Sequence, residues 1–463
     1  MEFPVSHRNT FIKWGVTLVV PLIFLCFPIT AEYTVQLRIF FMITAFVLLL
    51  TAMDLVPILI PSVLLPTMYY LSGIVPINQA FGAFTTPTVW MIFGALIFAN
   101  TLDECGLLRR IALGCIWRCG GTFTGTLYGL FLAGVIVSFI AFSQAFILLV
   151  TLTYGICKAM NLEKSNESAL VCIAGMLGGV TTLSWMYNPG YLALGEAGIR
   201  SFEPGFTILW YESLLYNGPI FFLSLGLIWL MTKVYRTKDI RFEGGREYFR
   251  KAYEKLGPVS LQEKKALFIV FLLMVYLFST PLHKLPAAWG FMTLPYVLFF
   301  PGFKVGSVET IKKTNFSIMF FIAGCLCIGV VASALGAEKL ISTLVSPLIA
   351  GQSSLAVLLL LLLMGTVCNL FMTPYAMMAA LSLPFGSLGV EAGITPLSSI
   401  MALMMSTDLI FMPYEIAPCL LMYSFGMISM GNFVKFYSFK TVATFILFIC
   451  IIWPYWKLCG WIQ

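Results

Sequence analysis

Two carboxylates lie seven residues apart in a stretch of this chain that is otherwise almost entirely apolar. Asp408 and Glu415 belong to the sequence STDLIFMPYEIAPCLLMY, together with Pro413 and Pro418. An intact helix would place both acids on one face, but Pro413 interrupts such a helix. A carboxylate inside a bilayer is costly unless it is paired, hydrated or protonated. Both acids are therefore candidates for binding a proton, a coupling cation or a cationic group, and the alternative is a structural contact to backbone amides or to a lysine.

The composition explains why these acids stand out. The 463 residues are 60% hydrophobic and only 10% charged, with a mean hydropathy of +0.95, whereas soluble domains carry about 25% charged residues. A chain of this kind is a polytopic membrane protein, in which each span needs about 20 mostly apolar residues. The expected spans are 13–31, 38–53, 55–74, 88–103, 168–186, 209–232, 266–281, 288–303, 316–334, 386–410 and 437–457. Two further apolar regions, 120–160 and 338–384, are too long for one span, and each is predicted to hold a hairpin that enters and leaves on one side.

The basic residues predict the orientation of the chain. Segment 233–265 holds ten Lys and Arg against five acids, and an excess of basic residues marks cytoplasmic loops. Arg8 and Lys13 place the N-terminus on the same side of a plasma (inner) membrane. The two histidines, His7 and His283, lie far from the acids, and the cysteines show no metal-binding spacing. We therefore expect no enzyme, no metal site and no nucleic-acid partner.

The two halves of the chain resemble each other. MIFGALIFANTLDECGLLRRI (91–111) is similar to FFIAGCLCIGVVASALGAEKLI (320–341), and Gly94 corresponds to Gly324, 230 residues later. The same offset aligns 120–160 with 350–390, and GGVTTLSWMYNPGY (178–191) with 408–421. The acidic stretch therefore has a partner that is broken around Pro189. Paired broken helices in corresponding positions are the best sequence indication of a transporter's binding site, because unwound backbone in a membrane needs polar partners.

At two blocks the chain resembles the divalent-anion:sodium symporter (DASS) family of the ion-transporter superfamily. LLTAMDLVPILIPSVLLPTMYYLSGI (49–74) and TPTVWMIFGALIFANTLDECGLLRRIAL (86–113) match the family's acid before a proline-interrupted span and its glycine span ending in Gly-Leu-x-x-Arg-Ile-Ala-Leu. Asp54 stands where the family usually has glutamate. IFMPYEIAPCLLMYSFGMISMGNFVKF (410–436) aligns without gaps on the family's Phe-Met-Leu-Pro-Val-Ala-Thr-Pro-Pro-Asn stretch. Nearly the whole chain follows the family's order of elements.

The resemblance implies an all-α polytopic membrane fold of two inverted repeats, each with a re-entrant hairpin and a broken helix. It also implies an elevator-type homodimer that carries succinate, citrate, related dicarboxylates or sulfate, mostly by symport with sodium. The implied divisions are 1–120 (N-terminal scaffold helices and the start of repeat 1), 121–200 (transport element of repeat 1), 201–265 (a span and the cytoplasmic linker), 266–337 (scaffold helices of repeat 2), 338–435 (transport element of repeat 2) and 436–463 (C-terminal span).

The residues that contact substrate in the family are largely replaced here. The family's hairpin tips carry Ser-Asn-Thr, and the matching positions are Ser143, Gln144 and Ala145 in the first half and Pro374, Tyr375 and Ala376 in the second. An alternative alignment of the second tip uses Cys368 and Asn369. With the two broken helices included, the candidate substrate-binding residues are Ser143, Gln144, Ala145, Thr182, Ser184, Asn188, Pro374, Tyr375, Ala376 and Pro418, and the candidates for cation or proton coupling are Glu415 and Asp408.

These residues predict a secondary active transporter of a small organic anion, dicarboxylate-like or related, that works by an elevator mechanism. Loss of the Ser-Asn pair in the second repeat argues against sodium coupling. An alternative keeps the same fold but couples to protons or exchanges solutes, and uses Glu415 for a zwitterionic or cation-bearing solute. A channel is a further alternative, since broken helices also build selectivity filters. The expected partners are the solute, the lipid bilayer and a second copy of the chain, and Na⁺ or H⁺ is the only expected cofactor, as a coupling ion.

Overall fold

A computed structural model shows a helical protein whose helices are joined by turns and short 3₁₀ segments. It describes the chain except residues 1–6, 54, 58, 121, 142–145, 161, 201, 202, 204, 236–244, 284, 315, 338, 339, 341, 342, 344–346, 348, 350, 371 and 463. Within the described ranges the only extended pairing is an isolated bridge between Ile394 and Ile462. The predicted all-α fold class is confirmed.

The helices of the first half fall into an N-terminal group and a group around the first break. They are α1 (His7–Val19), η1 (Val20–Leu25), α2 (Val35–Ala52), α3 (Leu59–Leu71), α4 (Ile77–Ala80), η2 (Gly82–Thr85), α5 (Pro87–Glu104), α6 (Leu107–Cys119), α7 (Phe123–Ile140), α8 (Phe146–Ala159), α9 (Asn166–Gly179), η3 (Thr181–Ser184), α10 (Pro189–Ile199), α11 (Glu212–Asn217) and α12 (Pro219–Val234).

The second half follows a similar order. Its helices are α13 (Gly245–Glu254), α14 (Leu261–Phe278), α15 (Thr280–His283), α16 (Ala287–Val297), α17 (Val308–Lys312), α18 (Phe316–Ala334), α20 (Ser354–Asn369), α21 (Pro374–Glu391), α22 (Pro396–Ser406), η5 (Pro413–Glu415), α23 (Ala417–Ser424), α24 (Met430–Leu447), η6 (Phe448–Ile452) and α25 (Trp453–Leu458).

Helix bounds in the two halves repeat at the offset found in the sequence. Helix α9 begins at Asn166 and α22 at Pro396, 230 residues later. At the same offset α5 corresponds to α18, α7 to α20, α8 to α21, and α10 to α23, each within a few residues. Each half therefore contains a helix pair, then a helix, a 3₁₀ turn and a short helix.

Only some of these helices are long and apolar enough to be identified as membrane spans. Among the described residues three helices are long and apolar enough to cross a membrane, namely Phe123–Ile140, Asn166–Ile199 and Met430–Leu458. A fourth is counted if the pair Pro87–Glu104 and Leu107–Cys119, bent by 63°, forms one span. Other apolar helices are shorter, for example Val35–Thr51 and Ser354–Asn369.

Three expected spans are wrong as single helices. Region 386–410 divides into α21 and α22 because Gly393 adopts a left-handed conformation (φ +70°) and Pro396 then starts a new helix. Region 209–232 divides between α11 and α12 at Gly218, which is followed by the N-terminal Pro219 of α12. Region 13–31 ends its helical part at Leu25.

Proline and a polar cap fix where the helices around the two breaks begin. Asn188 caps α10 and Pro189 is its first residue, while Thr373 caps α21 ahead of Pro374. A capping side chain satisfies a free backbone N–H, and proline fits the first helical position because it has no N–H to lose. These prolines therefore start helices at defined points.

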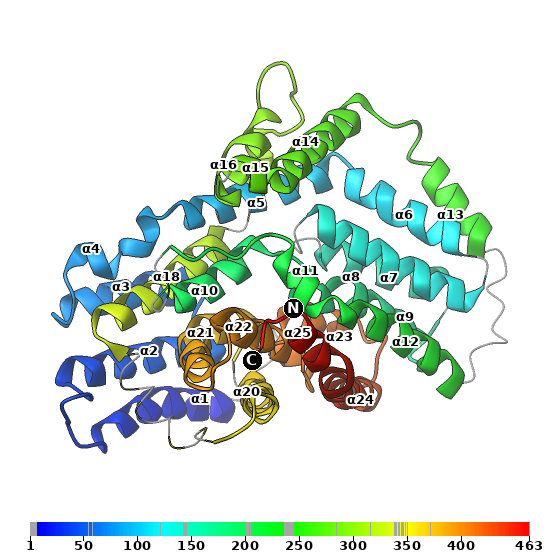
Figure 1. Ribbon diagram of the computed structural model, residues 1–463. Coiled ribbons are helices and arrows are strands. Elements are labelled where there is room, and N and C mark those ends of the chain that lie inside the picture. The colour runs from blue at the N-terminus through cyan, green and yellow to red at the C-terminus, as the bar shows by residue number, and fades with distance from the viewer. Residues whose placement is uncertain are drawn as a thin grey trace.

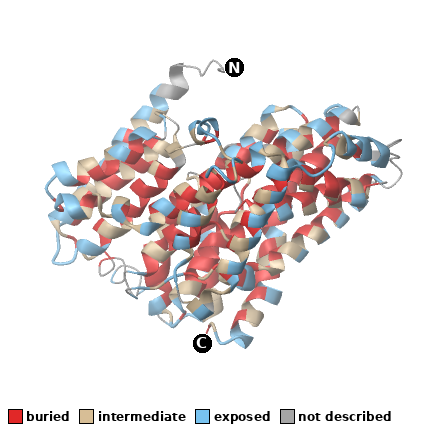
Figure 2. Ribbon diagram, turned by 90° about the horizontal axis from the view of Figure 1, so that it is seen from above, coloured by how far each residue is buried: buried red, intermediate tan, exposed pale blue. Residues whose placement is uncertain are grey.

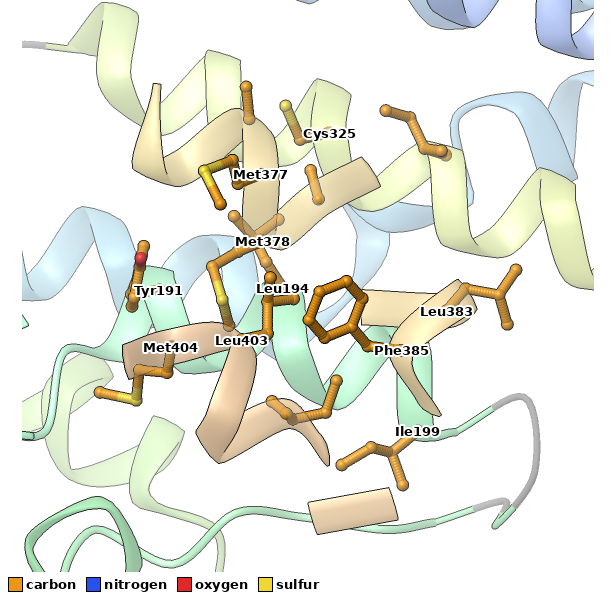
Figure 3. Packing of buried hydrophobic residues seen from close by; sticks show 14 of the residues in the cluster. Tyr191, Leu194, Ile199, Cys325, Met377, Met378, Leu383, Phe385, Leu403 and Met404 are labelled. Carbon is orange, nitrogen blue, oxygen red and sulfur yellow. The ribbon is translucent and has the colours of Figure 1, made fainter. Parts of the chain in front are cut away.

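The helices pack into a broad body with the second-half hairpin near its middle (Figure 1). Helices α1–α4 and α18 lie at one end, and α6, α7, α9 and α13 at the other. Buried residues fill the interior and exposed residues lie at the periphery (Figure 2). Figure 3 shows Tyr191 and Leu194 of α10 close to Met378 of α21 and Leu403 of α22, all four in one buried cluster. This cluster joins the short helix of the first half to the hairpin of the second.

Helices α7 and α9 approach so closely that two glycines face each other. A Cβ atom at Gly178 would lie 2.6 Å from the carbonyl oxygen of Phe131, and one at Gly134 would lie 2.6 Å from the carbonyl carbon of Gly178. A side chain at either position would push the helices apart. This contact holds the first helix of the hairpin region against the helix that leads into the first break.

Candidate functional site

The two helix breaks come together in the interior. In the first half α9 leads through η3 to α10, and in the second half α22 leads through η5 to α23. The Ser184 hydroxyl of the first break donates a hydrogen bond to Asp408 Oδ2 of the second, at 3.4 Å. Tyr191 and Thr407 join the breaks again through a hydroxyl–hydroxyl hydrogen bond. Residues more than 200 positions apart thus form one buried polar region.

Asn217 adds a third connection between the halves. Its side-chain amide donates to the carbonyl oxygen of Ser184 at 2.8 Å and to that of Met401 at 3.0 Å. The first acceptor lies in η3 and the second in α22. The amide therefore gives a partner to a carbonyl group of the first break and connects that break to α22.

Three consecutive carbonyl groups follow the end of α22, and side chains satisfy all of them. Asn369 donates to the carbonyl oxygens of Thr407 and Leu409, each at 3.2 Å. Lys440 donates to the carbonyl oxygen of Asp408 at 2.8 Å. The backbone can leave the helix here because a hairpin residue and a C-terminal lysine replace its lost partners.

Asp408 and Lys440 form a buried ion pair. The distance from Lys440 Nζ to Asp408 Oδ2 is 2.6 Å, and the side chains are only 1% and 6% exposed. The contact to a lysine, one of the two possibilities drawn from the sequence, is therefore present at Asp408. Lys440 itself was not among the predicted site residues. Its signal was a lysine inside the expected span 437–457, whose other cation, Lys457, stands at the very end. A cation inside a span is unusual enough to mark a functional residue.

Glu415 closes its own turn. Its Oε1 atom accepts hydrogen bonds from the backbone amides of Phe411 at 3.0 Å and Met412 at 2.7 Å. The residue is 3% exposed. Within the described part of the chain its second oxygen, Oε2, has no hydrogen-bond partner. One oxygen of Glu415 is thus structural, and the other is a buried acceptor left free.

Of the predicted hairpin-tip residues, those of the second half lie beside the first break. Pro374, Tyr375 and Ala376 form the first turn of α21. The Tyr375 hydroxyl donates to Asn188 Oδ1 at 3.5 Å, and that oxygen also caps α10 by accepting from the Tyr191 amide at 3.1 Å. The N-termini of α10 and α21 therefore lie next to each other.

The remaining predicted residues occupy defined places or lie outside the described ranges. Thr182 donates its hydroxyl to the carbonyl oxygen of Gly179 at 2.7 Å. Pro418 is buried in the first turn of α23. Asn369, the residue of the alternative tip alignment, ends α20 and holds the carbonyl groups described above. Ser143, Gln144, Ala145 and the family acid Asp54 lie outside the described residues.

A cavity of about 590 Å³ reaches the first break from one side. Thr86 and Thr88 line it at the start of α5, and Tyr187, next to Asn188, forms its inner wall. Arg200 and Glu196 of α10 also line it, and their side chains form an ion pair at 2.8 Å. The cavity offers hydroxyl groups and a guanidinium along a path to the break. Thr86, Thr88, Glu196 and Arg200 were not among the candidate site residues drawn from the sequence.

The helical fold, the apolar composition and the paired breaks define a secondary transporter that is an integral membrane protein. A family model described as Citrate transporter (CitMHS) matches residues 39–406. This match covers most of the chain, so the chain belongs to the citrate transporter family. That family lies in the ion-transporter superfamily with the DASS-like transporters, which accounts for the resemblance in the sequence.

Solved structures share the fold at low sequence identity. MtrF of Neisseria gonorrhoeae, described as illuminating a class of antimetabolite efflux pumps, is 11% identical with a TM-score of 0.62, over 99% of this chain and 96% of its own. The YdaH transporter of Alcanivorax borkumensis, described as having an unusual topology, is 13% identical with a TM-score of 0.56, over 98% of this chain and 99% of its own. A search of curated protein sequences finds no match.

Proposed function

We propose that this protein is a secondary active transporter that carries a small organic anion across the membrane by an elevator movement. The observation that carries the proposal is the meeting of the two helix breaks through Ser184 and Asp408. Broken helices at corresponding positions of two halves form the binding sites of transporters, because their free helix ends and unwound backbone can bind a solute.

The local charges favour an anion. The N-termini of α10 and α21 lie together at Asn188 and Tyr375, and helix N-termini carry partial positive charge that stabilises negative groups. The negative charge of Asp408 does not oppose this positive field, because the Lys440 ammonium group neutralises that charge. The name of the family model makes citrate the first candidate, and dicarboxylates are the wider class.

An elevator movement requires one group of helices to slide against another. We assign α7–α10 and α20–α23 to the moving group, with the two repeats inverted relative to each other. The N-terminal helices and α14–α18 form the scaffold, through which two copies of the chain associate. The cavity between α5 and α10 lies between these groups and supports a path for the solute from one side of the membrane.

Proteoliposomes containing the purified protein test this function. We expect saturable uptake of citrate or succinate and counterflow when unlabelled solute is trapped inside. Varying the sodium and proton gradients separately identifies the coupling ion. Absence of counterflow for every carboxylate and for sulfate would contradict the proposal, and unsaturable flux would indicate a channel. Reversing the gradients distinguishes uptake from efflux.

A second candidate has the same fold and couples transport to protons or exchanges a zwitterionic or cation-bearing solute. The free Oε2 oxygen of Glu415 favours it, since a buried acceptor of this kind can take a proton or a cationic group. Uptake that follows the proton gradient in sodium-free buffer supports this candidate. Uptake of a dicarboxylate that depends on sodium alone excludes it.

A further inference from the structure

The polar groups at the end of α22 have the composition of a cation site. Asp408 contributes a carboxylate oxygen and its own carbonyl oxygen, and the Ser184 hydroxyl lies 3.4 Å from that carboxylate. The C-terminal end of a helix also carries partial negative charge. Hard cations bind to carboxylate, carbonyl and hydroxyl oxygens of this kind, often where a membrane helix is unwound.

A cation already occupies this position. Lys440 Nζ lies 2.6 Å from Asp408 Oδ2 and 2.8 Å from the Asp408 carbonyl oxygen. The lysine extends from α24, and its side chain is 1% exposed, so the ammonium group is removed from water. The Tyr437 ring on the same helix lies 5.6 Å from the ammonium nitrogen and adds a weak attraction.

The other unwound carbonyl groups are satisfied as well. The Asn369 amide donates to the carbonyl oxygens of Thr407 and Leu409, so neither oxygen depends on an added ion for a partner. A metal ion bound to Oδ2 and the carbonyl oxygen of Asp408 would have to displace the lysine from both. That would leave a buried ammonium without a partner, which is strongly unfavourable.

We propose that Lys440 is the resident cation of this site, a tethered replacement for a transported metal ion. The Oδ2 and carbonyl oxygens of Asp408 are then unavailable to sodium, and the solute moves without a sodium ion at this position. The statement about solute movement rests on the proposed function. The statement about the site itself concerns ion binding and can be tested without transport.

Thermal unfolding of the purified protein in sodium chloride and in choline chloride tests the site. We expect the wild type to unfold at the same temperature in both salts. In choline chloride we expect Lys440→Ala to unfold at a temperature roughly 5 °C or more below that of the wild type, because the buried carboxylate of Asp408 loses its partner. Added sodium then raises its unfolding temperature saturably. The double variant Lys440→Ala with Asp408→Asn shows no sodium response, and Lys435→Ala, which changes an exposed lysine on the same helix, behaves as the wild type.

Two results overturn the proposal. The first is a folded Lys440→Ala protein whose response to sodium equals that of Lys435→Ala. The second is saturable binding of ²²Na⁺ by the wild type that weakens in Ser184→Ala, since this shows that sodium uses the site while the lysine is present. If Lys440→Ala does not fold, Lys440→Met replaces it, because methionine keeps the apolar part of the side chain. The ²²Na⁺ binding measured on the wild type and on Ser184→Ala then decides whether sodium uses the site.

Citrate counterflow separates this proposal from the transport function. We expect the wild type to give equal counterflow in sodium and choline buffers. Counterflow that requires sodium, together with ²²Na⁺ binding lost in Ser184→Ala, contradicts the resident-cation proposal and leaves the transport function intact. Absence of counterflow for any anion contradicts the transport function, while the unfolding and binding measurements still decide the nature of the site.

Discussion

Asp408 and Glu415 meet the cost of a buried carboxylate in different ways. Asp408 pairs with a lysine from another helix, whereas Glu415 accepts two amides of its own turn. The sequence made both of them candidates for a proton or cation site. The two carboxylates differ in what they connect: Asp408 bonds to side chains of other elements, whereas the hydrogen bonds of Glu415 stay within its own turn. Each of them keeps one oxygen without a hydrogen-bond partner in the described structure.

Replacing Glu415 by glutamine separates its two possible roles. Glutamine keeps an oxygen that can accept from Phe411 and Met412, so we expect Glu415→Gln to fold with an unchanged unfolding temperature. Glu415→Ala leaves both amides unsatisfied and is expected to lose about 1–3 kcal/mol of stability. Thermal unfolding of both variants measures this difference. Equal destabilisation by the two substitutions would show that the charge, rather than the hydrogen bonds, stabilises the turn.

Transport by Glu415→Gln tests the free oxygen. If Oε2 binds a proton or a cationic group during transport, removing the charge changes the pH dependence or the charge selectivity of uptake. We expect the wild-type dependence across about pH 5 to 8 to flatten in Glu415→Gln. The measurement is initial uptake at each pH with the membrane potential clamped. Identical pH profiles would leave Glu415 with its structural role alone.

Among the elements, close contact at glycine holds two helices of the proposed moving group against each other. Helices α7 and α9 meet at Gly134 and Gly178 with no room for a side chain. The helix leading into the first break is therefore fixed relative to the hairpin region. Gly155 in α8 differs, because nothing lies within 4 Å of a Cβ atom built there.

A pair of alanine substitutions measures the importance of this contact. Gly178→Ala places a methyl group against backbone and is expected to cost about 1–3 kcal/mol. Gly155→Ala adds the same atoms to open space and is expected to gain about 0.5–1 kcal/mol, because alanine favours helix more than glycine does. Chemical or thermal unfolding of both variants checks the prediction. A Gly178→Ala protein as stable as the wild type would show that the two helices can separate at little cost.

The sequence predicts elements better than it predicts their contacts. Prolines predicted the broken helices near Pro189 and Pro418, and the offset of 230 residues holds for the helix bounds. The turn at Gly393 was missed although Glu391, Gly393 and Pro396 supply a turn signal in the sequence, because the expected span 386–410 was drawn from its apolar content. The partner of Asp408 could not be found from spacing, since the packing of α24 decides which lysine reaches the break.

At the scale of the whole molecule, a second buried ion pair joins the two halves. Arg110 of α6 contacts Glu263 at the start of α14 at 2.6 Å, and the side chains are 9% and 4% exposed. The Arg110 guanidinium also donates to the carbonyl oxygens of Leu256 and Gly257. The linker predicted to be cytoplasmic is thereby fixed to the first half.

Arg110→Ala is expected to destabilise the protein by about 3 kcal/mol, because it leaves Glu263 buried without its partner. Arg250→Ala, which removes exposed ion pairs of α13, is expected to leave the unfolding temperature close to that of the wild type, because water screens these pairs. The unfolding temperatures of the two variants measure how much stability each substitution removes. Similar losses in both would mean that water screens the Arg110 pair as well.

The same pair gives stability a pH dependence. Burial raises the pKa of the Glu263 carboxyl, and hydrogen bonds from Arg110 and Ser260 more than offset this effect, so the pKa lies below its ordinary value of 4.5. The stabilisation is therefore complete above pH 4.5 and is lost as the pH falls through the lower pKa of the folded protein. The free energy of unfolding, measured as the pH is lowered through this range, should decrease in the wild type. Arg110→Ala should not show this decrease.

The pairing of Asp408 with Lys440 also constrains how the protein is made. A ribosome synthesises Asp408 thirty-two residues before Lys440, so the acid leaves the ribosome before its cation does. Until α24 is inserted, the nascent chain carries an uncompensated carboxylate, and the insertion machinery or water must shelter it. We expect chains that end between these two residues to be degraded, because their buried carboxylate has no partner. Insertion of α24 is therefore needed to complete a stable protein.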